Sequence, residues 1–263
     1  MLRSLLDGAI FAQCDLGGGP VCVMLHGWGR TSSDFAGLNA ALVADGISTL
    51  LLDLPGFGAS PPPEAAMGSS QYAKVVIAAI EEAIHELDDR RYLLVGHSFG
   101  GRVALEAGAM HPANLEEIFV SGVPLFRDPS GTKPAWAYRL VRRGAAMGLV
   151  STAKLESYKE RYGSKDYRAA SGVMREIFVK VVNEDYSETL RRIEVPVHFV
   201  WGQHDSAAPL GQARRALTLV KSGTLEVIEG ADHFQPILSP ALLVTSISSA
   251  VARLALQSGE TQE

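Results

Sequence analysis

The chain has 263 residues, of which 47% are apolar and 20% charged, and its net charge is −5. This apolar share can build a substantial core and excludes a disordered chain. The negative charge does not favour a nucleic-acid partner. The apolar runs fall well short of the about 18 residues that a membrane span needs.

The two cysteines bear on location. Cys14 and Cys22 lie on predicted strands, and two cysteines do not make a disulfide framework. Free buried thiols fit a reducing compartment, so we expect a cytoplasmic protein. The apolar N-terminal stretch is interrupted by Asp7, which favours a hairpin over a signal peptide.

After an initial hairpin, strands and helices alternate along the chain. Asp7-Gly8 lies between two apolar runs, a pattern typical of a hairpin turn. Apolar runs bounded by turn residues predict strands, and apolar residues at helical spacing predict helices. Strands are expected at 20–29, 47–58, 91–98, 115–123, 195–202 and 224–230, and helices at 31–46, 71–87, 99–112, 210–219 and 239–256.

This alternation predicts an α/β fold. Nearly continuous apolar strands that alternate with helices indicate a mostly parallel sheet with helices on both faces. Residues 125–190 break the rhythm, because they contain no clear strand and read as several helices with breaks near Gly144, Gly163 and Gly172. An insertion of this length is usually functional. We therefore expect a core formed by residues 1–124 and 191–263, and a helical cap formed by residues 125–190.

The segment VGHSFGG surrounds Ser98 with glycines at the junction between a predicted strand and a predicted helix. A serine at such a junction must adopt a strained backbone conformation, and Gly96 and Gly100 allow the strand and the helix to approach closely. This is the G-x-S-x-G nucleophile elbow in its expected context. It predicts that the Ser98 hydroxyl is a nucleophile exposed at the carboxyl edge of the sheet.

A serine nucleophile needs a base, and His233 is the candidate among seven histidines. It lies in a loop that follows the predicted strand 224–230, at the same edge of the sheet as Ser98. Several of the others have structural explanations: His97 lies beside the serine, His111 ends a helix, His198 lies within a strand, and His85 lies on a helix face.

The acid that holds the base is predicted to be Asp205. It lies in the loop after the strand 195–202, whereas Asp232 and Glu229 are close to His233 in sequence. A residue adjacent to the base cannot easily reach the ring nitrogen, but one from a neighbouring strand end can. The order Ser98, Asp205, His233 is the order expected for this type of fold.

The motifs LHGWG, DLPGFGAS, GHSFGG, WGQHD and GADHF occur in the order seen in the α/β-hydrolase superfamily, which this chain resembles over nearly its whole length. The resemblance implies that the backbone N–H groups of Trp28 and Phe99 form an oxyanion hole. It also implies an acyl-enzyme on Ser98, formed from a small-molecule acyl substrate and released by water. The serine disfavours dehalogenases and epoxide hydrolases of the superfamily, which carry an aspartate at the elbow.

Three functions remain open. The first is hydrolysis of an ester or thioester of a small or medium acyl group. The second is hydrolysis of carbon–carbon bonds in diketone-type substrates by the same triad. The third is a scaffold that binds a small molecule without catalysis, which an intact triad disfavours. Neither a metal-ligand cluster nor a flavin or nicotinamide fingerprint occurs in the sequence, so we expect no cofactor and no metal.

The predicted cap differs from the rest of the chain in charge. Its net charge is +4, against −9 for the remainder. Arg139, Arg142 and Arg143 have the spacing of one helix face. They form either a solvated surface or a binding site for an anionic substrate or an acidic carrier protein. In charge only, this cap resembles that of pimeloyl-carrier-protein methyl ester esterases.

Overall fold

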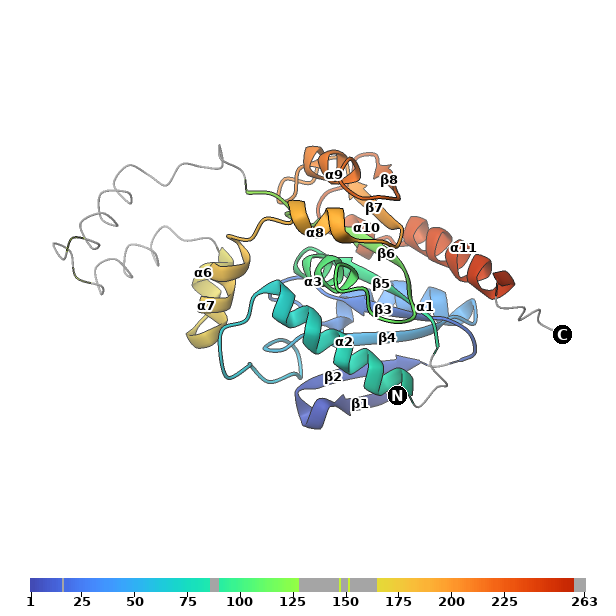
Figure 1. Cartoon of the computed structure of the whole chain (residues 1–263), viewed down its shortest axis with the longest axis horizontal. Helices are drawn as coiled ribbons and strands as arrows, with labels where there is room; N and C mark the ends of the chain where they lie inside the picture. The colour runs from blue at the N-terminus through green and yellow to red at the C-terminus, as the bar shows by residue number, and fades with distance from the viewer. Residues whose placement is uncertain (16, 86–89, 128–146, 148–150, 152–164, 258–263) are drawn as a thin grey trace.

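The computed structural model describes residues 1–15, 17–85, 90–127, 147, 151 and 165–257. Within this part of the chain, one eight-stranded sheet has the order β1-β2-β4-β3-β5-β6-β7-β8 (Figure 1). The strands are β1 (Leu2–Leu5), β2 (Ile10–Asp15), β3 (Val21–Leu25), β4 (Ser48–Asp53), β5 (Tyr92–His97), β6 (Leu115–Ser121), β7 (Val197–Gly202) and β8 (Gly223–Ile228). Along this order, each strand from β4 onward pairs in parallel with the next one, as far as β8. This confirms the mostly parallel sheet.

The predicted N-terminal hairpin is present, but its turn is longer than two residues. β1 and β2 pair antiparallel, and their last pair joins Leu5 to Ile10. The connection includes the short 3-10 helix η1 (Leu6–Gly8), in which Asp7 has φ of 54° and Gly8 has φ of 94°. Glycine adopts such values without steric cost, which explains why the chain reverses at this point.

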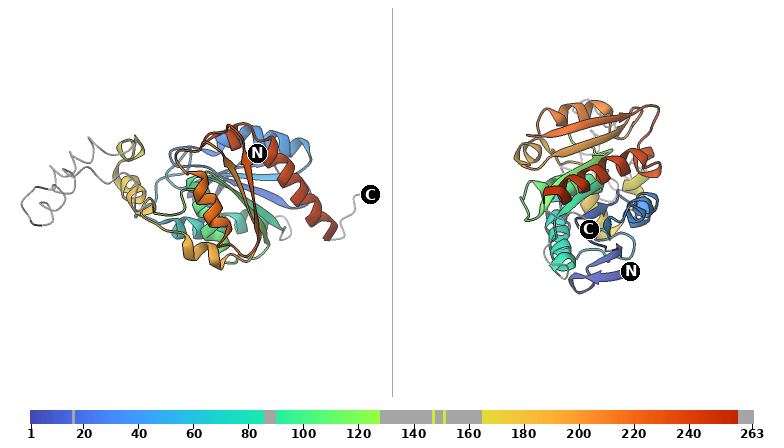
Figure 2. Two further views of the ribbon diagram at one scale, coloured as in Figure 1. Left: turned by 90° about the horizontal axis from the view of Figure 1, so that it is seen from above. Right: turned by 90° about the vertical axis from the view of Figure 1, so that its right-hand side faces the viewer.

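Helices cover both faces of the sheet (Figure 2). In chain order, the helices of the described residues are α1 (Ala36–Ala44), α2 (Ser69–His85), α3 (Phe99–Gly108), α6 (Lys165–Ala169), α7 (Gly172–Val181), α8 (Ser187–Arg192), α9 (Leu210–Leu217), α10 (Gln235–Leu238) and α11 (Ala241–Gln257). The short 3-10 helix η2 (Ser32–Phe35) precedes α1. The closing helix expected at 239–256 is α11, and the short helix α10 before it is an element that the sequence analysis did not predict.

Two apolar clusters lie on the two faces of the sheet, and strand alternation separates them. On β3, Val21, Val23 and Leu25 belong to the cluster that includes side chains of α2 and α3. Cys22 and Met24 belong to the cluster that includes side chains of α1 and α11. Successive side chains of a strand point to opposite faces, so a strand buried on both faces must be apolar throughout.

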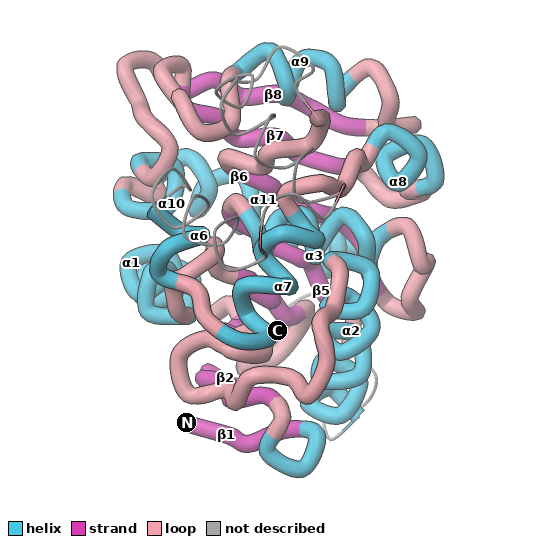
Figure 3. Tube along the Cα trace, turned by 90° about the vertical axis from the view of Figure 1, so that its left-hand side faces the viewer, coloured by secondary structure: helices cyan, strands magenta, loops and turns pink. Residues whose placement is uncertain are grey.

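The helices described within the predicted cap are α6, α7 and the first residues of α8. The expected boundary at residue 190 lies inside α8. Gly172, one of the three expected breaks, has φ of 51° and begins α7. Figure 3 views the molecule from the side on which α6 and α7 lie, and these two helices appear in front of the central strands.

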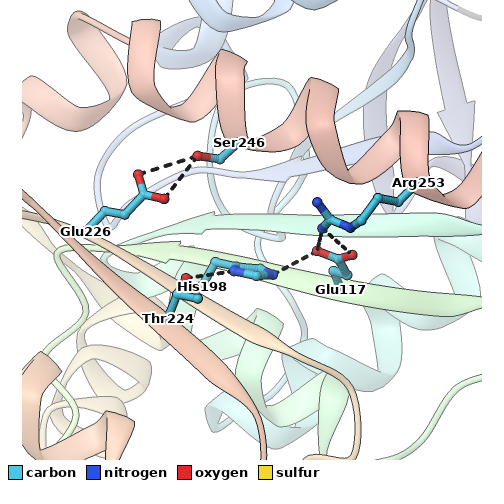
Figure 4. Close-up of polar contacts among 6 residues, drawn as sticks. All are labelled: Glu117, His198, Thr224, Glu226, Ser246 and Arg253. Atoms are coloured by element: carbon cyan, nitrogen blue, oxygen red, sulfur yellow. Dashed lines mark hydrogen bonds and ion pairs between the residues drawn. The ribbon is translucent and has the colours of Figure 1, made fainter.

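A polar cluster links three strands to α11 (Figure 4). The buried carboxylate of Glu117 on β6 accepts hydrogen bonds from His198 Nε2 at 2.8 Å and from Arg253 Nη2 at 2.9 and 3.1 Å. His198 Nδ1 lies 2.9 Å from Oγ1 of Thr224. Burial raises the pKa of Glu117, but the hydrogen bonds from His198 and Arg253 outweigh it and leave that pKa below its usual value.

We expect Glu117→Gln to lower the free energy of unfolding near pH 7 by about 1–3 kcal/mol, because a buried charged acceptor is lost. A depressed pKa stabilises the fold above the carboxyl's unfolded pKa of about 4.3 and loses this effect as the pH falls through the folded value. Urea unfolding at several pH values measures the difference, which should shrink below about pH 4. Glu226→Gln is the matched control, since among the described residues the Glu226 carboxylate has only the long contacts of 3.4 and 3.5 Å with Ser246. Equal losses in both variants, or a difference independent of pH, would contradict this prediction.

Candidate active site

Ser98 occupies a sharp turn between β5 and α3. Its φ of 50° and ψ of −110° are unfavourable for a residue with a side chain. The glycines around it permit the turn: a Cβ on Gly96 would lie 2.5 Å from Cα of Gly101, and one on Gly100 would lie 2.0 Å from the carbonyl oxygen of Leu25. The backbone around Ser98 therefore has the strained strand–turn–helix geometry that the sequence predicts.

The order of the sheet reverses beside this turn. β3 lies between β4 and β5, so the chain leaves β3 towards β4 on one side and returns to β5 on the other. In open α/β sheets, ligands bind outside the carboxyl ends of the strands at such a reversal. Here the carboxyl end of β3 leads into His26 and Gly27, and that of β5 leads into Ser98.

His26 is fully buried and holds the loop after β3. Its Nε2 accepts a hydrogen bond from the N–H of Leu54 at 3.0 Å, so Nδ1 carries the proton and donates to the carbonyl oxygen of Gly27 at 2.8 Å. Burial lowers the pKa of His26, which favours this neutral form. The histidine thus joins the end of β4 to the loop that contains Trp28.

Asp205 and His233 are joined directly. His233 Nδ1 lies 2.8 Å from Oδ2 of Asp205, whose side chain is only 1% exposed. The other oxygen of Asp205 accepts the N–H groups of Ala207 at 2.9 Å and Ala208 at 2.7 Å. The carboxylate is therefore fixed on both sides, and it orients the His233 ring.

The two loops that carry this pair are held together by backbone contacts. The N–H of His204 donates to the carbonyl oxygen of Ala231 at 2.8 Å. A Cβ on Gly202 would lie 2.2 Å from the carbonyl oxygen of Asp232, so only glycine allows this approach. Asp232 itself is turned to the backbone, where its Oδ1 accepts the N–H groups of Phe234 and Gln235.

The His97 ring is close both to the loop after β3 and to His233. A Cβ on Gly27 would lie 3.3 Å from Cδ2 of His97 and 3.5 Å from Cβ of Ser98. On the other side, the His97 and His233 rings are 4.7 Å apart. Burial, reinforced by nearby His233, lowers the pKa of His97 to about 3, so this ring is neutral at physiological pH. Within the described residues, the Ser98 hydroxyl makes no hydrogen bond, so it is not bonded to the acid–base pair of Asp205 and His233.

Gly122, which follows β6, is a site residue that the sequence analysis missed. It has φ of 60°, and a Cβ there would lie 2.8 Å from Cε1 of His233 and 3.0 Å from Cε1 of His97. A side chain at this position would displace the His233 ring. The available signal was a glycine near the end of the predicted strand 115–123, at the carboxyl edge of the sheet.

Trp28 and Phe99 lie side by side, with ring centroids 5.3 Å apart. The Trp28 ring also contacts Phe178 of α7 at 5.1 Å. A Cβ on Gly56 would lie 2.3 Å from Sδ of Met174, which is also on α7. Helix α7 therefore packs against the loop expected to form the oxyanion hole.

The alpha/beta hydrolase family model matches residues 22–245, most of the chain. This chain belongs to the alpha/beta hydrolase family. The match confirms the superfamily resemblance drawn from the motifs, and it agrees with the hydrolase activity that they predict.

Several characterised hydrolases are similar to this family member. A 2-hydroxy-6-oxononadienedioate/2-hydroxy-6-oxononatrienedioate hydrolase from Cupriavidus pinatubonensis is 25% identical over 82% of this chain and 81% of that protein. A pimeloyl-[acyl-carrier protein] methyl ester esterase from Aeromonas hydrophila is 38% identical over 42% of this chain and 41% of that protein. The crystal structure of an esterase from Rhodococcus sp. ECU1013 has a TM-score of 0.67 and 22% identity over 96% of this chain and 99% of that one, so it supports the fold.

The remaining sequence predictions for this hydrolase concern binding. Arg139, Arg142 and Arg143 lie outside the described residues. Within the described ranges, no group of three or more His, Cys, Asp or Glu side chains could hold a metal ion. No helix in that part of the chain has both the length and the hydropathy needed to cross a bilayer.

Proposed function

We propose that this hydrolase cleaves an ester or thioester of a small or medium acyl group through an acyl-enzyme on Ser98. The observation that carries the proposal is the 2.8 Å contact between His233 Nδ1 and the buried carboxylate of Asp205, together with the strained backbone of Ser98. An imidazole held in this way has Nε2 available to accept a proton, as a general base for serine requires.

In the proposed mechanism, His233 Nε2 takes the proton of the Ser98 hydroxyl as its Oγ attacks the substrate carbonyl. The Asp205 carboxylate accepts the Nδ1–H and stabilises the imidazolium that forms. The N–H groups of Trp28 and Phe99 bind the negative oxygen of the tetrahedral intermediate. His233 then protonates the leaving group, and water activated by the same ring releases the acid.

The substrate is proposed to bind between the core and the cap. In this proposal, residues 1–124 and 191–263 form the core, and residues 125–190 form the cap. The basic cap, with Arg139, Arg142 and Arg143, supports an anionic acyl substrate or an acidic carrier protein. The local similarity to an esterase acting on a pimeloyl-carrier protein supports the second possibility. The two unbridged, buried cysteines, Cys14 and Cys22, support the proposed cytoplasmic location.

A carbon–carbon bond hydrolase is the second candidate. The relative from Cupriavidus pinatubonensis favours it, because the similarity to that dienedioate hydrolase extends over most of both chains. The same three side chains would serve such a reaction. Side-by-side assays of esters, thioesters and vinylogous diketones separate the two candidates.

A fluorophosphonate tests the nucleophile without knowledge of the substrate. We expect Ser98 Oγ to form a bond to phosphorus with loss of fluoride, which intact-protein mass spectrometry detects and peptide mapping locates. Ser206→Ala is the matched control, because Ser206 is an exposed serine next to Asp205, and this variant should be labelled like the wild type. Label on another residue, or equal labelling in Ser98→Ala, would contradict the proposal, and absence of label in the wild type would favour a binding scaffold.

A further inference from the structure

Arg30 borders the candidate active site from the loop after β3. The N–H of Arg30 donates to the carbonyl oxygen of Gly27 at 3.3 Å, and Gly29 within this turn has φ of 67°. The turn brings the arginine stem back over Gly27: a Cβ on Gly27 would lie 3.7 Å from Cγ of Arg30 and 3.5 Å from Cβ of Ser98. The side chain of Arg30 therefore starts beside the proposed nucleophile.

The guanidinium of Arg30 is held in one orientation. Its Nε donates to Asp34 Oδ2 and its Nη2 donates to Asp34 Oδ1, each at 2.6 Å. Its Cζ lies 5.3 Å from the centre of the Phe234 ring. That ring packs in turn against His233 at 4.9 Å and against His97 at 5.5 Å. The arginine is thus connected to the acid–base pair through one aromatic side chain.

Asp34 leaves part of the guanidinium available. The bidentate pair uses Nε and Nη2, and within the described residues Nη1 makes no hydrogen bond. The Arg30 side chain is 44% exposed, whereas that of Asp34 is 8% exposed. Solvent and solutes therefore reach the cation more easily than its counter-ion. An arginine fixed in this way loses little side-chain entropy when it binds a second acceptor.

We propose that Arg30 determines specificity by binding an anionic group, of the carboxylate type, on the acyl substrate. The inference rests on the proposed serine-hydrolase function and names the substrate class of that site. Because Asp34 neutralises much of the charge, the interaction depends on directed hydrogen bonds from the free edge of the guanidinium. It is independent of the arginines of the cap.

The test compares para-nitrophenyl hydrogen glutarate with para-nitrophenyl pentanoate, which carry acyl chains of equal length. The quantity measured is the ratio of kcat/KM for the anionic ester to kcat/KM for the neutral ester. We expect Arg30→Gln to lower this ratio about tenfold, as loss of a hydrogen bond to a charged group implies. Raising the salt concentration should lower the wild-type ratio, because the site is partly exposed.

Arg191→Gln is the matched control, because Arg191 is an exposed arginine paired with Glu188 on α8. Its ratio should equal that of the wild type. If Arg30 only braces the turn, Arg30→Gln would reduce both rates and the melting temperature and leave the ratio unchanged, which would overturn the inference.

A binding measurement separates this inference from the proposed function. In the Ser98→Ala background, titration calorimetry with glutarate monomethyl ester should give a dissociation constant about tenfold weaker when Arg30→Gln is added. If the wild type cleaved neither nitrophenyl ester, the proposed function would fail, and the calorimetric result alone would decide the role of Arg30. Equal affinities of the Ser98→Ala protein with and without Arg30→Gln would overturn that role.

Discussion

Ser98→Ala is expected to abolish turnover, with a loss of at least about 10⁴-fold in kcat. Without the hydroxyl no acyl-enzyme can form, and the neighbouring His233 and the oxyanion N–H groups can only assist attack by water. The fold should be retained, since Ser98 makes its hydrogen bonds through the backbone, including one from its N–H to the carbonyl oxygen of Ser121 at 2.9 Å. Alanine at a positive φ has the same steric cost as serine.

The measurement is kcat on the best ester of the panel, with circular dichroism and thermal unfolding to verify the fold. Contaminating esterase is excluded by purifying the variant from a strain and column that never held the wild type. A residual rate above about 1% in a folded, clean preparation would contradict the assignment of Ser98, because a triad serine normally contributes far more than that.

Asp205→Asn is expected to reduce kcat by roughly 10³–10⁴-fold. The asparagine oxygen can still accept the N–H groups of Ala207 and Ala208, so the loop should keep its shape. Its NH₂ group, however, would face His233 Nδ1 and donate to it. The ring would then carry its proton on Nε2, where it could no longer accept the proton of Ser98.

Asp232→Asn provides the comparison, because this residue is next to His233 in sequence and, in the part of the chain that the structure describes, its carboxylate accepts hydrogen bonds only from the backbone of Phe234 and Gln235. Asparagine preserves that acceptor, so we expect a loss of less than about tenfold. Kinetics of both variants over a range of pH, on protein shown to be folded, give the answer. Equal losses would leave the acid unidentified, and inactivity of Asp232→Asn alone would show that Asp205 is not the acid.

Sequence reasoning reached the elbow at Ser98 for a local reason. Steric limits on a strand–turn–helix junction depend on residues within a few positions. Gly96 and Gly100 in the sequence therefore indicate directly where a side chain would not fit. The apolar strands were predictable for a similar reason, because a strand covered on both faces must be apolar at every position. The length of the N-terminal turn could not be predicted, because Asp7-Gly8 is compatible with more than one loop length.

The choice between Asp205 and Asp232 was open to argument from the sequence, and tertiary structure decides which carboxylate contacts the ring. The contact exists because β7 and β8 are adjacent and their loops are bonded to each other. The orientation of Asp232 towards the backbone adds a reason that spacing alone does not contain. Neither property is encoded within one loop.

What the sequence by itself determined is the family, the strained serine and the order of the elements, because each depends on local backbone and side-chain chemistry. Only the tertiary structure decided that Gly122 must lack a side chain beside His233, that α7 packs on Trp28, and that Arg30 and Phe234 meet at the site. These contacts join residues far apart in the chain, and their geometry depends on the packing of the whole sheet and its loops.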